Sequence, residues 1–551
     1  MPGSPRSRLL LEVAAVAVLM TAATALRWWV FETGRSDFDS DEAITSLMAK
    51  DIWLGRDFPV FFSGQTYGGS LESYFTALFF AARGRSDVAG VRLAGVALMV
   101  AGFSLYYAFI RWAAGRGAAL MALALLVCAP GYFTVWSVKQ RGGYLLLPIL
   151  SIAIWWSALA LDEAMERATS VGLPLRKWIV ALGAILGLAV GLGWWTHRSV
   201  ISALGALALM GAWRSALRWR RGQRIQTLSV WAIPSCAAGF LIGYAPVLWF
   251  IARGGRPRIP FQLADAGQVR QNARVLLEDL MPALLGAPVA DGGLPKSLVL
   301  LTALAATVAV AGCSLAVRRA RTTAIPRQRN AACVLLFSAA IACVAMVFNE
   351  FTRFVGGDPR HLIVVVYVLA AAIALGWAGS GDGYGRLGRK RRWPAFGATG
   401  LLAVYGLSTT IALSPDPLND RYIPKRYEPL IDFLTSRQAR ACYWMDGNLG
   451  RGYWDAEILT FYRDERIVFA APQPVTRLPR HAEFARLHQR PAVWVSRFPA
   501  DLVAQYSAAF FRHPLEIHDL GEFRVTFSDE TERMYEVVYR LVQEPWYHPR
   551  Q

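Results

Sequence analysis

The sequence predicts an α-helical polytopic membrane protein of about eleven transmembrane helices, followed by a small C-terminal α/β domain. Hydrophobic residues make up 55% of the 551 residues and charged residues only 18%, whereas soluble domains carry about 25% charged residues. The apolar residues lie in uncharged blocks, each roughly the 17–25 residues that a helix needs to cross a bilayer. From about Ser414 onward charges and aromatic residues interleave, which indicates a separate domain.

Eleven apolar blocks predict the membrane spans in chain order. They are Leu9–Leu26, Val91–Ile110, Ala118–Trp136, Tyr144–Leu161, Trp178–Trp195, Ser199–Trp213, Leu228–Ile251, Leu298–Val317, Ala331–Phe348, Leu362–Ala378 and Ala395–Leu413. The sixth block is short and follows the fifth through a tight turn at Thr196-His197-Arg198. The run Leu71–Ala82 is apolar but too short to span, so we expect it to lie along the membrane surface.

The first block resembles a signal peptide in part, because Arg6 and Arg8 precede it and Ala23-Thr24-Ala25 resembles a signal-peptidase site. The block is long for a signal sequence, and Arg27-Trp28-Trp29 follows it. We therefore interpret it as an uncleaved first membrane helix.

Basic residues set the expected orientation. With a cytoplasmic N-terminus, arginine-rich loops such as 214–227, 318–330 and 379–394 fall in the cytoplasm, and the opposite side receives the first loop, 27–90, with nine acids against six bases. This asymmetry follows the positive-inside rule. The expected protein is thus a multi-pass protein of a bacterial-type plasma membrane, surrounded by membrane lipids. The same placement of the basic residues argues against a nucleic-acid partner, despite a net charge of +19.

Residues 1–413 are expected to form the transmembrane domain and residues 414–551 an extracytoplasmic domain. Strand-like runs in that domain are Ala441–Met445, Arg466–Ala470, Ala492–Ser496, Phe523–Phe527 and Tyr535–Leu541; helix-like runs are Ala456–Arg463 and Asp501–Phe511. The stretch Gly452–Glu457 either contacts substrate or is structural. The six cysteines contain no CxxC pair, which excludes a zinc site or a disulfide framework.

An acidic cluster opens the first outer loop. Asp37, Asp39, Asp41 and Glu42 place four carboxylates within six residues, shortly after a membrane helix. One interpretation is a solvated loop or a helix N-cap, for which Ser40 and Asp41 are suited. The other is a carboxylate that deprotonates an acceptor or holds a divalent cation such as Mg²⁺ or Mn²⁺, for which Asp41 and Glu42 would be the ligands.

The first loop also carries a series of motifs in a characteristic order. After the membrane helix come Asp41-Glu42-Ala43, Gly55-Arg56-Asp57-Phe58-Pro59-Val60, the aromatic and glycine segment from Tyr67, the surface run Leu71–Ala82, and Val91-Arg92-Leu93-Ala94. This order resembles the first loop of the GT-C glycosyltransferases, in particular the group of protein O-mannosyltransferases and lipid A aminoarabinose transferases. The resemblance is strongest over residues 27–136, and the span pattern extends it to about residue 378.

The resemblance implies a hexosyl- or pentosyltransferase that takes a sugar from a polyprenyl-phosphate donor at the outer membrane face. In that family an Asp-Glu pair in the first loop carries the chemistry, and Asp41-Glu42 match it. Asp358-Pro359-Arg360-His361-Leu362 resembles the family's Arg-Tyr-Leu entry to a late span, with His361 in place of Tyr. Gly68–Glu72 stands where many relatives have a Lys-Pro-Pro-Leu segment. The acceptor is a lipid, a glycan or a protein, and no cofactor other than the cation above is implied.

Cationic side chains near the donor phosphate would stabilise the leaving group. The candidates for this role are Lys139, Arg141, His197, Arg198, Arg360 and His361, and further candidate substrate contacts are Asp39, Tyr67, Glu72, Arg270 and Arg274. The alternative for each basic residue is a contact with lipid headgroups at a helix end.

Two other classes of protein fit a polytopic chain. A transporter or flippase of lipid-linked glycans should show ionisable residues inside its spans and paired repeats, whereas these spans are nearly free of charge and no repeat is visible. A polysaccharide polymerase or ligase usually has its large outer loop late in the chain, whereas here the large acidic loop is the first one. The sequence therefore favours an inverting transferase with Asp41 as general base.

Overall fold

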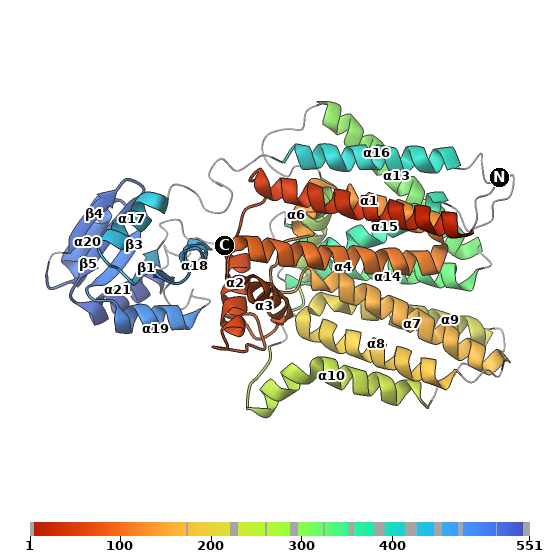
Figure 1. Ribbon diagram of the computed structural model, residues 1–551, viewed down its shortest axis with the longest axis horizontal. Helices are drawn as coiled ribbons and strands as arrows, with labels where there is room; N and C mark the ends of the chain where they lie inside the picture. Colours follow the sequence, from red (N-terminus) through yellow and green to blue (C-terminus); the bar gives the residue numbers. More distant parts are fainter. Residues whose placement is uncertain are drawn as a thin grey trace.

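The computed structural model consists of a large helical bundle and a smaller domain built on a β-sheet (Figure 1). It describes residues 5–171, 175–220, 230–258, 262–286, 296–322, 325–350, 352, 358–378, 392–413, 427–445, 454–471, 478–513 and 515–543. Several predicted features lie outside these residues: parts of the arginine-rich loops 214–227 and 379–394, and Gly452 and Tyr453.

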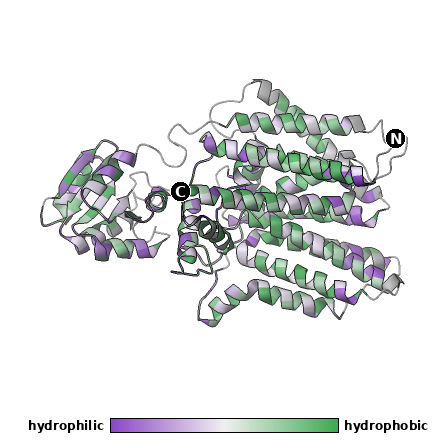
Figure 2. Cartoon of the chain, in the orientation of Figure 1, coloured by the Kyte–Doolittle hydropathy of each residue, from purple (hydrophilic) through white to green (hydrophobic). Residues whose placement is uncertain are grey.

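Nine helices among the described residues are long and apolar enough to cross a membrane, which confirms a polytopic membrane protein. They lie in α1 (Pro5–Glu32), α4 (Val88–Ala114), α7 (Leu146–Val171), α8 (Arg176–Thr196), α9 with the short η1 turn before it (Ile201–Arg220, Arg198–Val200), α10 (Ala232–Ala252), α13 (Lys296–Thr322), α14 (Pro326–Phe348) and α15 with η4 (Ile363–Ala378, Pro359–Leu362). Figure 2 shows these helices rich in hydrophobic residues and the sheet domain more hydrophilic.

Two of the eleven predicted spans differ in the structure. The predicted span Ala118–Trp136 is broken into α5 (Arg116–Val127) and α6 (Gly131–Trp136). The break falls at Pro130, because proline has no N–H to donate and disfavours helix in the residue before it. The predicted span Ala395–Leu413 corresponds to α16 (Arg392–Ile411), which has the length of a span but is not among the nine apolar helices.

Helix α15 lies at the centre of the bundle and is buried along most of its length. Helix α10, by contrast, packs mainly against α8, and its Ile242 and Trp249 are exposed at the periphery. Glycines bring these two helices close together: a Cβ on Gly187 would lie 1.9 Å from the carbonyl oxygen of Cys236, and one on Gly239 would lie 2.1 Å from that of Ala184.

The first loop crosses one end of the bundle as two helices, α2 (Ser40–Trp53) and α3 (Leu71–Arg83) (Figure 1). Helix α3 has 13 residues, so it is too short to span a bilayer, as predicted. It ends at Gly84, whose backbone has a left-handed conformation with φ of 65°.

Two short helices, α11 (Ala266–Arg274) and α12 (Met281–Leu284), flank a π-helical turn at Val275–Leu280 between α10 and α13. Helix α11 begins with a capping box, in which Asp265 accepts from the backbone N–H of Gln268 and the Gln268 side chain accepts from that of Asp265. It packs against α14.

The C-terminal domain contains a five-stranded sheet covered by helices. The strands are β1 (Ala441–Met445), β2 (Val468–Ala470), β3 (Ala492–Ser496), β4 (Glu516–Leu520) and β5 (Phe523–Ser528), in the order β2-β1-β3-β5-β4. β2, β1 and β3 are parallel, whereas β5 and β4 form an antiparallel edge. The helices are α17 (Glu428–Ser436), α18 (Trp454–Tyr462), α19 (Pro479–His488), α20 (Ala500–Phe510) and α21 (Thr531–Gln543).

One predicted strand of this domain is wrong. Tyr535–Leu541 belongs to α21, which buries Met534, Val537 and Val538. That spacing of three and four residues is the period of a helix, and packing on one face outweighs the strand preference of valine and tyrosine.

Candidate active site

The acidic cluster forms the N-terminal cap of α2. The Asp39 Oδ1 atom accepts a hydrogen bond from the backbone N–H of Glu42 at 3.1 Å, and the Glu42 carboxylate accepts one from the backbone N–H of Asp39 at 3.4 Å. This reciprocal capping box fixes where the helix begins. The N-cap interpretation of the sequence is thus correct in kind, but the cap is Asp39 and not Ser40 or Asp41.

Basic side chains surround the carboxylates. Lys139 lies 2.6 Å from Asp37 and 2.8 Å from Asp39. Arg141 bridges two carboxylates, with Nε 3.3 Å from Asp39 and a terminal nitrogen 2.8 Å from Asp41. The Glu42 carboxylate pairs with Arg92, which comes from the start of α4. The carboxylates therefore belong to a network of ion pairs, and the interpretation of this segment as a solvated loop is wrong.

The carboxylates of this network differ in burial and in pKa. Burial alone would raise the pKa of Asp39, but Lys139 and Arg141 outweigh it and hold that pKa below its usual range. Burial raises the pKa of Glu42 to about 7, although Arg92 and Lys139 oppose the shift. The Glu42 side chain is 0% exposed, whereas that of Asp41 is 22% exposed. Asp41 is therefore the member of the Asp-Glu pair that a substrate can reach.

Glu72 holds the loop that carries Lys139 and Arg141. Its carboxylate accepts the backbone N–H of Leu145 at 2.9 Å, and burial raises its pKa to about 7 even though backbone N–H groups of this loop favour the charged form. The loop turns through Gly143, whose φ of 103° favours glycine. A Cβ there would lie 2.9 Å from the carbonyl oxygen of Thr196, at the end of α8. Glu72 thus has a positioning role in the structure.

A second group of side chains lies beside the carboxylates. The Tyr144 ring packs against His197 with centroids 4.5 Å apart and against His361 at 5.4 Å. Arg360 lies 5.9 Å from the centre of the Tyr144 ring, and its charge interacts with those of Asp41 and Arg141. The structure thus brings Asp41 and Arg360 to the same end of the bundle, although about 320 residues separate them.

Arg360 and Arg198, which follows His197 and lies over the Trp194 ring, each keep a free donor atom. Arg360 Nε and Arg198 Nε are buried and have no hydrogen-bond partner among the described residues. Asp358 lies 3.6 Å from Arg360 and accepts a hydrogen bond from Tyr132, so it orients the guanidinium without occupying every nitrogen. Buried unpaired donors are costly unless an acceptor reaches them. These two side chains are therefore suited to bind an anion.

His197 contributes no positive charge at neutral pH. Burial and the charges of Arg360 and Arg198 lower its pKa to about 4. Its Nδ1 lies 3.2 Å from the backbone N–H of Ser199, so Nδ1 is the acceptor and the proton of the neutral ring resides on Nε2. His197 is thus a hydrogen-bond donor and not the cation that the sequence predicts.

The remaining predicted substrate contacts vary in their setting. Tyr67 is half-buried in the first loop, and Arg270 and Arg274 are exposed on α11. Lys139 is engaged by the carboxylates. No motif in the sequence marks Tyr132 or Tyr144 as site residues. The only signal for Tyr144 is its place after Arg141-Gly142-Gly143, a polar turn before a span.

A divalent cation does not fit the first-loop carboxylates. Arg141 pairs with Asp41 and Arg92 with Glu42, so the two proposed ligands already have cationic partners. In the part of the chain that the structure describes, no three His, Cys, Asp or Glu side chains are grouped to hold a metal ion. We therefore assign no step to a metal.

No protein-family model matches the sequence, and no curated protein matches it. The fold is similar to that of ArnT from Cupriavidus metallidurans bound to undecaprenyl phosphate, with a TM-score of 0.58 and 11% identity over 96% of this chain and 99% of that one. The apo form of that protein matches with the same TM-score and coverage at 10% identity. An oligosaccharyltransferase of Archaeoglobus fulgidus in complex with Zn and sulfate has a TM-score of 0.49 and 12% identity over 94% of this chain and 73% of that one.

The chain therefore has a fold similar to that of ArnT, a lipid A aminoarabinose transferase, along almost the whole length of both chains. This agrees with the resemblance of the first loop to that group of proteins.

Proposed function

We propose that this protein is a membrane glycosyltransferase that moves a hexose or pentose from a polyprenyl phosphate to a lipid, glycan or protein acceptor. ArnT, whose fold it resembles, is known bound to undecaprenyl phosphate. The observation that carries the proposal is that Asp41, whose side chain is 22% exposed, lies at the same end of the bundle as Arg360, whose Nε atom is buried and has no hydrogen-bond partner among the described residues. In this proposal the Asp41 carboxylate accepts a proton, and the arginine binds the phosphate of the donor.

In the proposed reaction Asp41 removes the proton from the acceptor group, whose oxygen (or other nucleophilic atom) attacks the anomeric carbon of the sugar. The bond between that carbon and the phosphate oxygen breaks, and its electron pair remains on the lipid phosphate. Arg360 and Arg198 stabilise the charge that develops there. Because the displacement is direct, the anomeric configuration inverts. Glu42 is too buried to reach substrate, so it orients Asp41 through the helix cap.

We place this reaction at the extracytoplasmic face, with the N-terminus in the cytoplasm. The support is the arginine asymmetry of the sequence, together with the location of the first loop and the C-terminal domain at the same end of the bundle (Figure 1). Cysteine labelling tests the topology: a residue in 427–543 should react with an impermeant reagent from outside the cell. Labelling only from the cytoplasmic side would invert the assignment.

The proposed base is tested by Asp41→Asn in purified protein supplied with undecaprenyl-phosphate sugars. Asparagine keeps the shape of aspartate but removes its basicity, so kcat should fall by about 10²–10⁴-fold. The matched control is Asp37→Asn, which changes a more exposed carboxylate of the same cluster, 56% exposed, and should cost much less. Full turnover in Asp41→Asn would remove the main support for the proposal.

A further inference from the structure

The C-terminal domain contacts the start of the helix that carries Asp41. Phe461, at the end of α18, packs against Phe38 with ring centroids 5.7 Å apart and against Phe80 of α3 at 6.3 Å. Phe38 lies between Asp37 and Asp39 in the sequence, directly before the α2 cap. Phe461 and Leu478 thus complete a small apolar core with Phe38, Leu47 and residues of α3 and α4. Phe461 of the C-terminal domain therefore packs against Phe38, which lies within the acidic cluster.

The same domain also contacts the end of α2, through ion pairs. Lys50 lies 2.7 Å from Asp464 and 2.9 Å from Glu465, both in the turn after α18. Asp51 pairs with Arg480 of α19. The side chains of Lys50 and Asp51 are only 7% and 5% exposed, so the domain buries these charges. Buried charges need their partners, because removing one partner leaves the other desolvated and unpaired.

These contacts hold α2 at both ends. The helix has 14 residues and is therefore about 20 Å long. Asp41 lies in its first turn and Lys50 and Asp51 in its last, so a tilt or shift at either end moves the Asp41 carboxylate. In-line displacement requires reacting groups to be placed closely, and a misplacement of about 1 Å can cost about 10²-fold in rate.

We propose that the C-terminal domain is a clamp that positions α2, and that Phe461, Lys50, Asp51 and Arg480 are positioning residues for Asp41. The expected effect on rate rests on the proposed function, whereas the expected effect on the position and stability of α2 does not. It assigns to the domain the role of fixing the catalytic helix.

The test uses the full-length protein with Phe461→Ala and Arg480→Gln. Each should lower kcat by about tenfold or more while KM for the lipid donor stays within about twofold, because the donor-phosphate residues lie on other elements. Phe461→Leu, which retains an apolar side chain, should recover most of the activity. The control is Arg437→Gln, which removes a half-exposed ion pair with Glu516 elsewhere in the domain and should leave kcat unchanged.

Hydrogen exchange separates the clamp from the reaction. In Arg480→Gln the amides of residues 40–53 should exchange faster, while those of β1, β3 and α15 keep their wild-type rates. If the wild type turns over no lipid-phosphate sugar but this local change occurs, the clamp stands and the proposed function fails. Unchanged exchange in α2, or wild-type kcat in both variants of an active enzyme, would overturn the clamp.

Discussion

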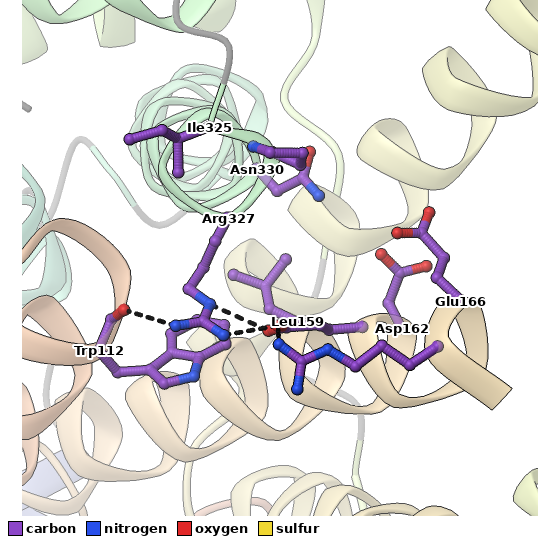
Figure 3. Close-up of a pocket in the computed structure, with 10 residues that line it drawn as sticks. Trp112, Leu159, Asp162, Glu166, Ile325, Arg327 and Asn330 are labelled. Atoms are coloured by element: carbon purple, nitrogen blue, oxygen red, sulfur yellow. Dashed lines mark hydrogen bonds and ion pairs between the residues drawn. The ribbon is translucent and has the colours of Figure 1, made fainter. Parts of the chain in front are cut away.

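The two ends of the helical bundle both carry carboxylates paired with arginines, but they differ in burial. At the end opposite the first loop, Arg327 binds Glu163 with Nε 2.9 Å from the carboxylate, and Arg214 pairs with Asp162 and Glu166. Arg327 and the three carboxylates line a pocket of about 410 Å³, and Arg214 does not. Figure 3 shows this pocket with Trp112, Leu159 and Asn330. The side chains of these ion pairs are 19–40% exposed, whereas those of Lys139, Arg141 and Glu42 are at most 7% exposed.

The difference shows that pairing of charges does not identify a site. At the pocket end the arginines contact the carboxylates beside them, and solvent reaches the pairs. At the first-loop end the carboxylates are neutralised by Lys139 and Arg141, while Arg360 and Arg198 each retain a buried Nε atom that no described residue binds. We propose the donor-phosphate site at the first-loop end because the free Nε of Arg360 lies there beside buried, already paired carboxylates, although the Arg360 side chain itself is 28% exposed.

The largest difference in activity is expected between variants of Arg360 and Arg327, which lie at opposite ends of the bundle. Arg360→Gln should lower kcat/KM for the lipid donor by about 10²-fold, because it removes a donor to the developing phosphate charge. Arg327→Gln should leave turnover unchanged, since this residue lies at the other end of the bundle. A steady-state assay of both variants decides, and equal losses would show that the distinction between the ends is wrong.

A second comparison concerns stability. Lys139→Gln removes one of the two cationic partners of the buried Asp39 carboxylate, and breaking a buried pair costs about 3–5 kcal/mol when no other partner remains. Arg214→Gln breaks pairs that solvent can screen, for which about 1 kcal/mol or less is expected. Thermal unfolding in detergent should therefore show a clear loss for Lys139→Gln and a small one for Arg214→Gln. The reverse order would mean that the first-loop network is not desolvated.

The smallest effect is a pH dependence of stability from Glu42. Its pKa in the folded protein is about 7, above the ordinary value of 4.5, so the fold favours the protonated carboxyl. This contribution is fully present below the unfolded pKa and is lost as the pH rises through 7. Unfolding temperatures from about pH 5 to about pH 8 should fall more steeply for wild type than for Glu42→Gln. Parallel curves would show that Arg92 keeps Glu42 ionised.

Much of the fold could be predicted from local patterns. Nine of the eleven predicted spans are found among the apolar helices because a membrane helix is specified by its own hydropathy. The prediction of one continuous span at Ala118–Trp136 is wrong because Pro130 interrupts the helix, although the residues on either side are apolar. The strand predicted at Tyr535–Leu541 failed because burial on one helical face decides its structure.

The site was less predictable. The sequence indicates Asp41 and Arg360, because each lies in a recognisable motif, but it does not indicate which carboxylate is exposed. That depends on Arg92, Lys139 and Arg141, which reach the cluster from distant segments. The contacts of Phe461 and Arg480 with the first loop are also hidden, because about 420 residues separate the partners. Nor could local pattern show that His197 is neutral, since its environment comes from other helices.

The close approach of α8 and α10 has a consequence for assembly in a bilayer. Lipid tails solvate an apolar helix as well as another helix does, so α10 gains little from burial and depends on backbone proximity for its attachment. A leucine at Gly187 or Gly239 would force the two backbones apart, since even a Cβ meets a carbonyl oxygen there at about 2 Å. The pair would then separate sideways in the plane of the membrane without unfolding. Phe250 of α10, whose ring lies 5.0 Å from that of Phe61, would carry this movement into the first loop.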